Sequence, residues 1–426
     1  MKKNNEKENP WKPEDEMEHP NTKLEWWAVE SFFETNEDKK KWSVKAVFTK
    51  WYKDKEDNGS LFNITIFDEN NKKCYACRLL TKSQKLKIIK DKFDVSYKNC
   101  NIKGSYPNYN MVLINEKDDI KLELSFHSES LPRWIAQDIT DGWLPAGLGS
   151  YRYGFIPKNK VSGVITFKGR KYHLNGTGYF EHIWGDFLYD TPLANIAGLK
   201  KTIPIYAKFS LKWLEEHQLK IPNSITVSSE NNPSGYDWAW AVLDNGWTIF
   251  YGNILFWLMN GPAFGTLILS KDGKNYQEFT NITFNYNKTK RSKNYDFYYP
   301  TDFDINAYKG NQHIFLKFKM TCPANEYVSE FEKKGFWKGL VICEAPGLVE
   351  GSFNDECKKI NLKGYAKIEP QRQVSVLGHN VLKIDIIKPP KGVGISLNLN
   401  SNFLNKKIFL IIQLVPKLLF KIKNSR

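Results

Sequence analysis

The run LNGTGYFEHIWG, Leu174–Gly185, places a carboxylate, an imidazole and three aromatic rings in one short stretch. If this run is extended, its side chains alternate between two faces. Alternation puts His182 and Trp184 on one face and Tyr179 and Glu181 on the other. The pattern predicts a strand that presents His182 and Trp184 to a pocket and turns Glu181 toward the opposite side.

Short β-type runs surround this stretch. Alternating apolar and polar residues, bounded by turn residues, are typical of strands. Residues 161–185 predict a hairpin that turns at residues 168–170, and residues 236–257 predict another that turns at 244–246. Further strand-like runs occupy residues 24–34, 42–52, 60–67, 93–97, 111–115 and 120–126. Regularly spaced strands favour a sandwich or a closed barrel over an α/β fold.

Two stretches interrupt the strand pattern. Residues 131–150 contain prolines and glycines and predict a long loop near a barrel mouth. Residues 186–234 carry four prolines and one short helical pattern over 209–218, and we expect them to connect two domains.

Length and pattern together predict four regions. Residues 1–20 are charged and lack apolar periodicity, so we expect a disordered tail. The N-terminal domain with its connecting segment then spans 21–230, and the C-terminal domain spans 231–372. Residues 373–426 form a basic, apolar C-terminal tail.

The end of this tail leaves two alternatives open. The apolar run over 406–423 is interrupted by Gln413, Pro416 and Lys417, and falls short of the ~20 apolar residues of a membrane span. It could pack on the core, or it could make peripheral membrane contact through residues 403–426, with lysines facing anionic lipid. No secretory segment is recognised, so we expect a cytoplasmic protein that could also lie peripherally at the membrane.

The charge does not favour a nucleic-acid partner. The formal net charge is +15, but only seven of the 62 basic residues are arginine, and the lysines are spread along the chain. Arginine supplies most of the bidentate recognition of bases and phosphates. The 15% aromatic content, with 14 tryptophans, instead suits sheet-rich cores or apolar and sugar-binding pockets. The oligomeric state cannot be inferred.

Motifs for metals and cofactors are missing from the sequence. Cys74 and Cys77 form a lone CxxC without the second pair that a structural zinc site needs, so we expect two buried or half-buried strand cysteines. No GxGxxG, P-loop, HExxH or GxSxG signature is present. We therefore expect neither a metal nor a cofactor.

Four runs carry a resemblance to a known family. They are HPNTKLEWWAVESFFE (19–34), YRYGFIPKNKVSGVITFKG (151–169), NGTGYFEHIWG (175–185) and GYDWAWAVLDNG (235–246). The chain resembles, over about residues 19–369, the tandem lipocalin-like proteins that include carotenoid 1,2-hydratase (hydroxyneurosporene synthase) and the related lipocalin-type fungal cyclases. The resemblance implies an all-β fold with two consecutive lipocalin-like antiparallel β-barrels and a few short helices. Its hydratase branch implies addition of water to a C=C bond of a hydrophobic isoprenoid or carotenoid-like substrate.

Such a hydration needs an acid that stays protonated in an apolar cavity. Burial disfavours the charged form of a carboxyl and raises its pKa. Asp237 suits this role, because small alanines share its strand face and leave space beside the carboxyl. As a hypothesis, Asp237 donates the proton and His182 orients the carboxyl or the water.

Aromatic rings facing the cavity can stabilise a passing cation. We expect the substrate to be bound by five such side chains: Trp184, Tyr179, Trp27, Tyr236 and Trp238.

Other interpretations remain open. His182 could be a satisfied core residue, and Asp237 could cap the connection or pair with a lysine. Glu25 and the tryptophans beside it suit a plug that closes the barrel better than a site. The whole protein could be a non-catalytic carrier of a lipid or terpenoid, since lipocalin-type cavities hold such ligands. The tryptophan content alone would also suit a carbohydrate-binding β-protein.

Overall fold

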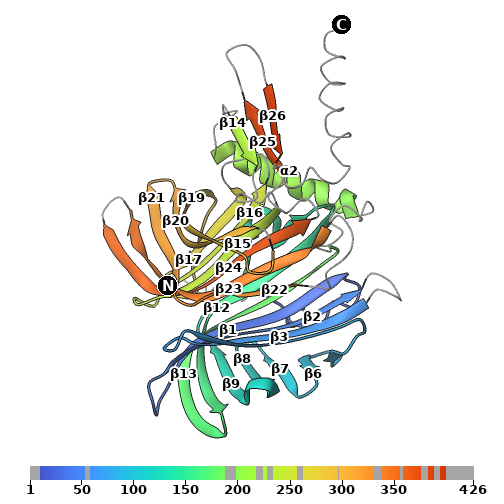
Figure 1. Ribbon diagram of the computed structural model, residues 1–426, viewed down its shortest axis with the longest axis vertical. Coiled ribbons are helices and arrows are strands. Elements are labelled where there is room, and N and C mark those ends of the chain that lie inside the picture. The colour runs from blue at the N-terminus through green and yellow to red at the C-terminus, as the bar shows by residue number, and fades with distance from the viewer. Residues whose placement is uncertain are drawn as a thin grey trace, which may run out of the picture.

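Nearly all of the structure is antiparallel β-sheet. The computed structural model describes residues 10–52, 58–187, 198–216, 224–227, 234–256, 262–295, 297–329, 337–355, 358–375, 382–387 and 394–399 (Figure 1). They form two large curled sheets, one above the other in Figure 1, with few helices. The structure confirms the all-β prediction, and the two sheets are consecutive lipocalin-like barrels.

The first sheet has 13 strands. From β1 to β4, and again from β5 to β9, each strand pairs with the next along the chain; β12 and β13 follow, and β13 returns to pair with β1. The strands are β1 (Leu24–Thr35), β2 (Lys41–Tyr52), β3 (Asn58–Asp68), β4 (Lys73–Thr81), β5 (Lys87–Ile88), β6 (Phe93–Tyr97), β7 (Cys100–Ser105), β8 (Asn108–Asn115), β9 (Ile120–Ser128), β10 (Arg133–Trp134), β11 (Trp143–Ala146), β12 (Gly149–Phe167) and β13 (Arg170–Gly185).

The second sheet has ten strands and repeats this topology, because its last strand returns to its first. Its strands are β15 (Ser234–Leu243), β16 (Thr248–Phe256), β17 (Pro262–Ser270), β18 (Tyr276–Phe279), β19 (Asn281–Arg291), β20 (Tyr298–Lys309), β21 (Gln312–Met320), β22 (Asn325–Val328), β23 (Trp337–Asn354) and β24 (Lys359–Ser375). A small third sheet joins β14 (Ser224–Val227), β25 (Leu382–Ile387) and β26 (Gly394–Leu399). The helices are η1 (Pro13–Asp15), η2 (Glu116–Asp118), α1 (Gln137–Thr140) and α2 (Leu199–Glu216).

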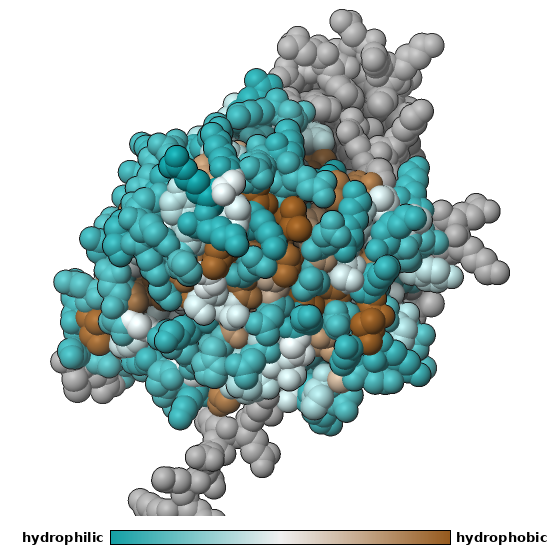
Figure 2. Space-filling model, turned by 90° about the horizontal axis from the view of Figure 1, so that it is seen from below, coloured by the Kyte–Doolittle hydropathy of each residue, from teal (hydrophilic) through white to brown (hydrophobic). Residues whose placement is uncertain are grey.

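Strand alternation divides each barrel into an inner and an outer face. In β1 and β13, Trp27 and Phe180 point into the core of the first barrel. Their neighbours Trp26 and Tyr179 point outward, toward the second barrel. The face of the molecule in Figure 2 is mostly hydrophilic with scattered apolar side chains, as expected when apolar residues fill the two cores and the layer between them.

Three expectations from the sequence need correction. Residues 131–150 are not one long loop, since β10 and β11 pair with β12. The helix expected at 209–218 begins at Leu199 and contains Pro204. Tertiary packing of the helix outweighs the low helix propensity of proline. In it, Thr202 is buried and donates to the Leu148 carbonyl, and Tyr206 donates to that of Gly147.

The third correction concerns residues 10–20, which are not a disordered tail. Trp11 is 4% exposed and packs against Trp134 and Phe180, with ring centroids 5.3 and 6.1 Å away. The buried Glu16 carboxylate accepts a hydrogen bond of 2.9 Å from the Tyr109 hydroxyl, and burial raises its pKa to about 7. One buried tryptophan thus fixes a charged segment that lacks any periodic pattern.

The described part of the chain has no helix long and apolar enough to cross a membrane. The proposed membrane contact through residues 403–426 lies outside the described residues. Cys74 and Cys77 are half-buried free cysteines on β4, as expected.

Replacing Trp11 tests whether the N-terminal segment belongs to the first barrel. We expect Trp11→Ala to lower the free energy of unfolding by about 3–5 kcal/mol, because it empties a packed aromatic site. Urea denaturation followed by circular dichroism measures the loss. Tyr52→Ala, at a residue 50% exposed, is the control and should change stability by no more than about 0.5 kcal/mol. An equally small effect for Trp11→Ala would show that the segment is dispensable.

Candidate functional site

The two barrels pack against each other through a layer of aromatic rings. Phe155 of β12 stacks on Phe250 of β16 at 4.8 Å, and Phe32 of β1 stacks on Trp240 of β15 at 5.3 Å. The Trp240 indole N–H donates to the Pro157 carbonyl at 2.9 Å. The outer faces of the two sheets therefore form one interior, separate from the two barrel cores.

Two cavities lie in this inter-barrel layer, on either side of a shared wall. The two cavities have volumes of about 80 and 90 Å³. One buried water needs about 10–15 Å³ on the same measure, so each cavity has room for more than a single water. The wall consists of Trp26, Tyr153, Ile183, Tyr236 and Trp238. The first cavity extends to α2, and the second to charged residues of β1, β2 and β24. Such apolar spaces with a few convergent polar groups are typical of small-molecule sites.

Glu181 is held at the second cavity by three donors. Its carboxylate accepts hydrogen bonds from the hydroxyls of Tyr153 and Tyr179 and, at 3.1 Å, from the Trp26 indole. The Tyr153 hydroxyl also accepts from the Trp238 indole at 3.0 Å. Burial raises the pKa of both phenols well above the usual value, so they stay protonated donors. This network fixes the carboxylate among aromatic rings.

A buried ionic cluster lies beside this network. Lys45 of β2 lies 3.4 Å from Glu30 of β1, 3.6 Å from Glu344 of β23, and in contact with Glu369 of β24. All four residues are at most 5% exposed. Carboxyl groups outnumber the lysines even when the buried Lys367 is added, so full ionisation would leave uncompensated negative charge in a low-dielectric interior.

The excess of carboxyl groups favours protonation of one of them, and Glu30 is the best candidate. Burial raises the pKa of Glu30, and the nearby ammonium groups of Lys45 and Lys367 only partly oppose the rise. For Lys45, burial lowers the pKa, but attraction by Glu30 and Glu344 outweighs it and leaves the pKa above the usual value. Among the described residues, the Glu30 Oε2 atom has no hydrogen-bond partner. Glu30 therefore combines a bias toward the protonated form with a place in the lining of the cavity.

The predicted site residues lie in three different interiors: the layer between the barrels, the first barrel and the second barrel. Tyr236 and Trp238 line both inter-barrel cavities. Tyr179 lines neither, but its hydroxyl donates to Glu181, which lines the second. Trp27 and Trp184 lie in the core of the first barrel instead, because they occupy the inner faces of β1 and β13. They do not line either cavity.

His182 and Asp237 do not share a cavity, contrary to the hypothesis drawn from the sequence. His182 lies on the inner face of β13, where its ring stacks on Trp27 inside the first barrel. Asp237 is 1% exposed inside the second barrel, where its oxygens bind the Arg372 guanidinium at 2.8 Å and the Tyr286 hydroxyl. Each points away from the inter-barrel layer, because its sequence neighbours face that layer. A catalytic role for either residue stays a prediction.

Sequence analysis missed the residues that the fold brings to the second cavity. Glu30, Lys45 and Tyr153 belong to β1, β2 and β12, and none is near another in the sequence. The alternation of β1 alone contained a signal, since Glu30 shares a face with Trp26 and Phe32. The expectation that Glu181 turns away from His182 was right, but the face it turns to is the cavity.

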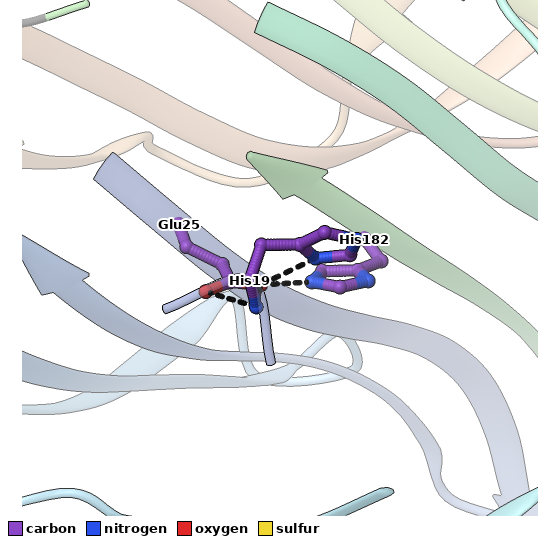
Figure 3. A group of neighbouring side chains, drawn as sticks. All are labelled: His19, Glu25 and His182. Atoms are coloured by element: carbon purple, nitrogen blue, oxygen red, sulfur yellow. Dashed lines mark hydrogen bonds and ion pairs between the residues drawn. The ribbon is translucent and has the colours of Figure 1, made fainter. Parts of the chain in front are cut away.

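A group able to hold a metal lies at one end of the first barrel. His19, Glu25 and His182 bring three ligand atoms within 4.8 Å of one another (Figure 3). Both histidine rings approach Glu25 Oε1, at 3.0 and 2.9 Å. Burial alone would raise the pKa of Glu25, but hydrogen bonds from both histidines and the charge of Lys50 lower it below its usual range. Burial lowers the pKa of His182, and its bond to Glu25 opposes this.

Comparison with known proteins supports the fold. A crystal structure assigned as AttH, from Nitrosomonas europaea, has 17% identity and a TM-score of 0.57, and the match covers 84% of this chain and 95% of that one. Kievitone hydratase from Nectria haematococca has 14% identity and a TM-score of 0.54, over 82% of this chain and 89% of that one. No family model and no curated protein sequence matches the chain.

The Asp237–Arg372 pair is expected to stabilise the second barrel. Arg372→Met should lower the free energy of unfolding by about 3–5 kcal/mol, because it leaves the Asp237 carboxylate buried without its cation. Adding Asp237→Asn should restore part of the loss, and urea denaturation of the single and double variants measures the coupling. The Arg152–Asp141 pair is the control, because the Asp141 side chain is 69% exposed, and Asp141→Asn should cost no more than about 1 kcal/mol. No coupling between Asp237 and Arg372 would contradict a structural role for the pair.

Proposed function

We propose that the protein is a cofactor-free hydratase, or a related isomerase or cyclase, that acts on a C=C bond of a hydrophobic isoprenoid-like substrate in the inter-barrel cavities. The observation that carries the proposal is Glu30, a buried carboxyl with a raised pKa that lines an aromatic cavity. A protonated acid in an apolar site is what alkene protonation requires. A hydratase with this fold is compatible with the proposal.

In this proposal each group has its own step. Glu30 transfers its proton to one alkene carbon, and positive charge develops on the other. The faces of Trp26 and Trp238 and the Glu181 carboxylate can stabilise that cation. Water then adds to the cation, and its surplus proton returns to a carboxylate of the cluster. In a cyclase, a second double bond of the substrate attacks the cation instead of water, and the new cation loses a proton to a carboxylate of the cluster.

This assignment moves the acid from Asp237 to Glu30. Both oxygens of Asp237 are engaged inside the second barrel, whereas the Glu30 Oε2 atom has no partner among the described residues. The runner-up function, a non-catalytic carrier of a lipid or terpenoid, would use the same cavities without proton transfer.

Replacing Glu30 tests the proposal. The purified protein is incubated in deuterated water with squalene, acyclic carotenes and shorter isoprenoid alkenes, and the products are analysed by mass spectrometry. The wild type should add deuterium and oxygen to one substrate, and Glu30→Gln should lower the rate at least about 100-fold, because it removes the acid. Glu34→Gln, on the exposed part of the same strand, is the control and should keep the rate. Undiminished turnover by Glu30→Gln would exclude Glu30 as the acid, and binding without any conversion would favour the carrier.

The pH profile of the same reaction gives an independent check. A general acid works only while protonated, so the rate should be highest below the raised pKa of Glu30 and fall as the pH rises through it. With the ordinary pKa of an exposed glutamate, the fall would come near pH 4–5 instead. Initial rates between pH 4 and pH 9, at about pH-unit intervals, distinguish the two cases.

A further inference from the structure

The hydrogen-bond geometry of His182 requires a proton or a metal cation between its ring and Glu25. The Nδ1 atom lies 2.8 Å from the Asp15 carbonyl oxygen, which can only accept, so Nδ1 carries a hydrogen. The Nε2 atom lies 2.9 Å from Glu25 Oε1, a second acceptor. A neutral imidazole has one N–H, so its Nε2 lone pair would face the carboxylate directly. Either a second proton or a metal cation must lie at this position.

Convergence of a third ligand favours a metal over a proton. His19 Nδ1 lies 3.0 Å from the same Glu25 oxygen, and the three ligand atoms lie within 4.8 Å of one another (Figure 3). A tetrahedral zinc ion with bonds of about 2.0–2.1 Å separates neighbouring ligand atoms by about 3.3 Å. The two nitrogen–oxygen distances, 3.0 and 2.9 Å, are within a few tenths of an ångström of this value, and no pair of the three ligand atoms is more than 4.8 Å apart.

The surroundings have the features of an outer shell around metal ligands. Ligating histidines usually donate their other N–H to a carbonyl or carboxylate, as His182 does to Asp15. Ligating carboxylates are usually hydrogen-bonded too, and Glu25 Oε2 lies 2.8 Å from the Lys50 ammonium. Glu18, 2.5 Å from that ammonium, offsets its charge.

Aromatic stacking positions the two histidine rings, and partial exposure of His19 opens the site to solvent. The His19 ring stacks on Trp184 at 3.8 Å, and the His182 ring stacks on Trp27 at 4.7 Å, so neighbouring aromatic residues hold both rings in place. His182 and Glu25 are fully buried, whereas the His19 side chain is 25% exposed. An ion can enter and leave on the His19 side.

We propose that His19, Glu25 and His182 bind a divalent transition-metal ion, with zinc as the best-suited metal. Two imidazole nitrogens and one carboxylate oxygen form a donor set that zinc accepts, with a fourth position left for water. The bound ion joins the N-terminal segment, through His19, to strands β1 and β13. It lies inside the first barrel, away from the proposed reaction cavity, and does not depend on the function proposed above.

Metal binding by the full-length protein tests this proposal. After treatment with chelator, the protein is titrated with Zn²⁺ by calorimetry and with Co²⁺ by visible absorption. We expect one equivalent of each ion to bind, with a cobalt spectrum that lacks thiolate charge-transfer bands. Zn²⁺ should also raise the Tm, because the ion binds the folded state only.

Variants locate the ion. His19→Phe keeps a ring to stack on Trp184 but removes a ligand, and should lose the bound equivalent. Glu25→Gln is a second ligand variant, and Lys50→Met should weaken binding about 10–100-fold as an outer partner. The matched control is His173→Phe, because His173 and Glu37 form an exposed pair of the same kind, with a 2.8 Å contact. It should bind Zn²⁺ like the wild type.

Two outcomes would overturn the proposal. If the wild type binds no Zn²⁺ and no Co²⁺, a second proton on His182 fills the position. If His19→Phe and Glu25→Gln, checked for folding by circular dichroism, bind Co²⁺ as tightly as the wild type, the ion lies elsewhere. Loss of binding in Cys74→Ser would then place it at the thiols.

Discussion

The two barrels bury charged side chains in the layer between them. The outer faces of β1, β2 and β13 meet those of β15, β23 and β24, so residues that would face water on an isolated barrel are enclosed. Aromatic rings fill one part of this layer, and Glu30, Lys45, Glu344 and Glu369 fill another. Such a cluster is a weak source of stability, because desolvation offsets much of the attraction between the charges. In the proposed function, the cluster holds a proton next to an apolar cavity.

The molecule separates three interiors with different contents. The first barrel encloses its own N-terminal segment and the His19–Glu25–His182 group, and the second encloses the Asp237–Arg372 pair. The layer between them contains both cavities. Neighbouring residues of one strand therefore serve different interiors, as Glu181 and His182 do, because alternation sends them to opposite faces.

Sequence analysis recovered what depends on local pattern. Alternation located the strands around Phe93–Tyr97 and both predicted hairpins, and it separated Glu181 from His182. It failed where pairing between distant strands decides the outcome. Two carboxyl partners of Lys45, Glu344 and Glu369, come from the other barrel, so no local spacing could reveal them. The partner of Asp237 likewise comes from a distant strand, β24. The burial of Trp11 could not be predicted either, since a single tryptophan in a charged segment has no periodicity to detect.

The proposed reaction requires Glu30 to carry a proton at neutral pH, and infrared spectroscopy can detect that proton. A protonated carboxyl has a C=O stretch distinct from those of an ionised carboxylate. The spectrum of the wild type minus that of Glu30→Gln, recorded at pH 7 in deuterated buffer, should contain one protonated-carboxyl band. That band should vanish as the pH is raised. A difference spectrum with only carboxylate bands at pH 7 would show that Glu30 is ionised. Glu30 could then not serve as the acid.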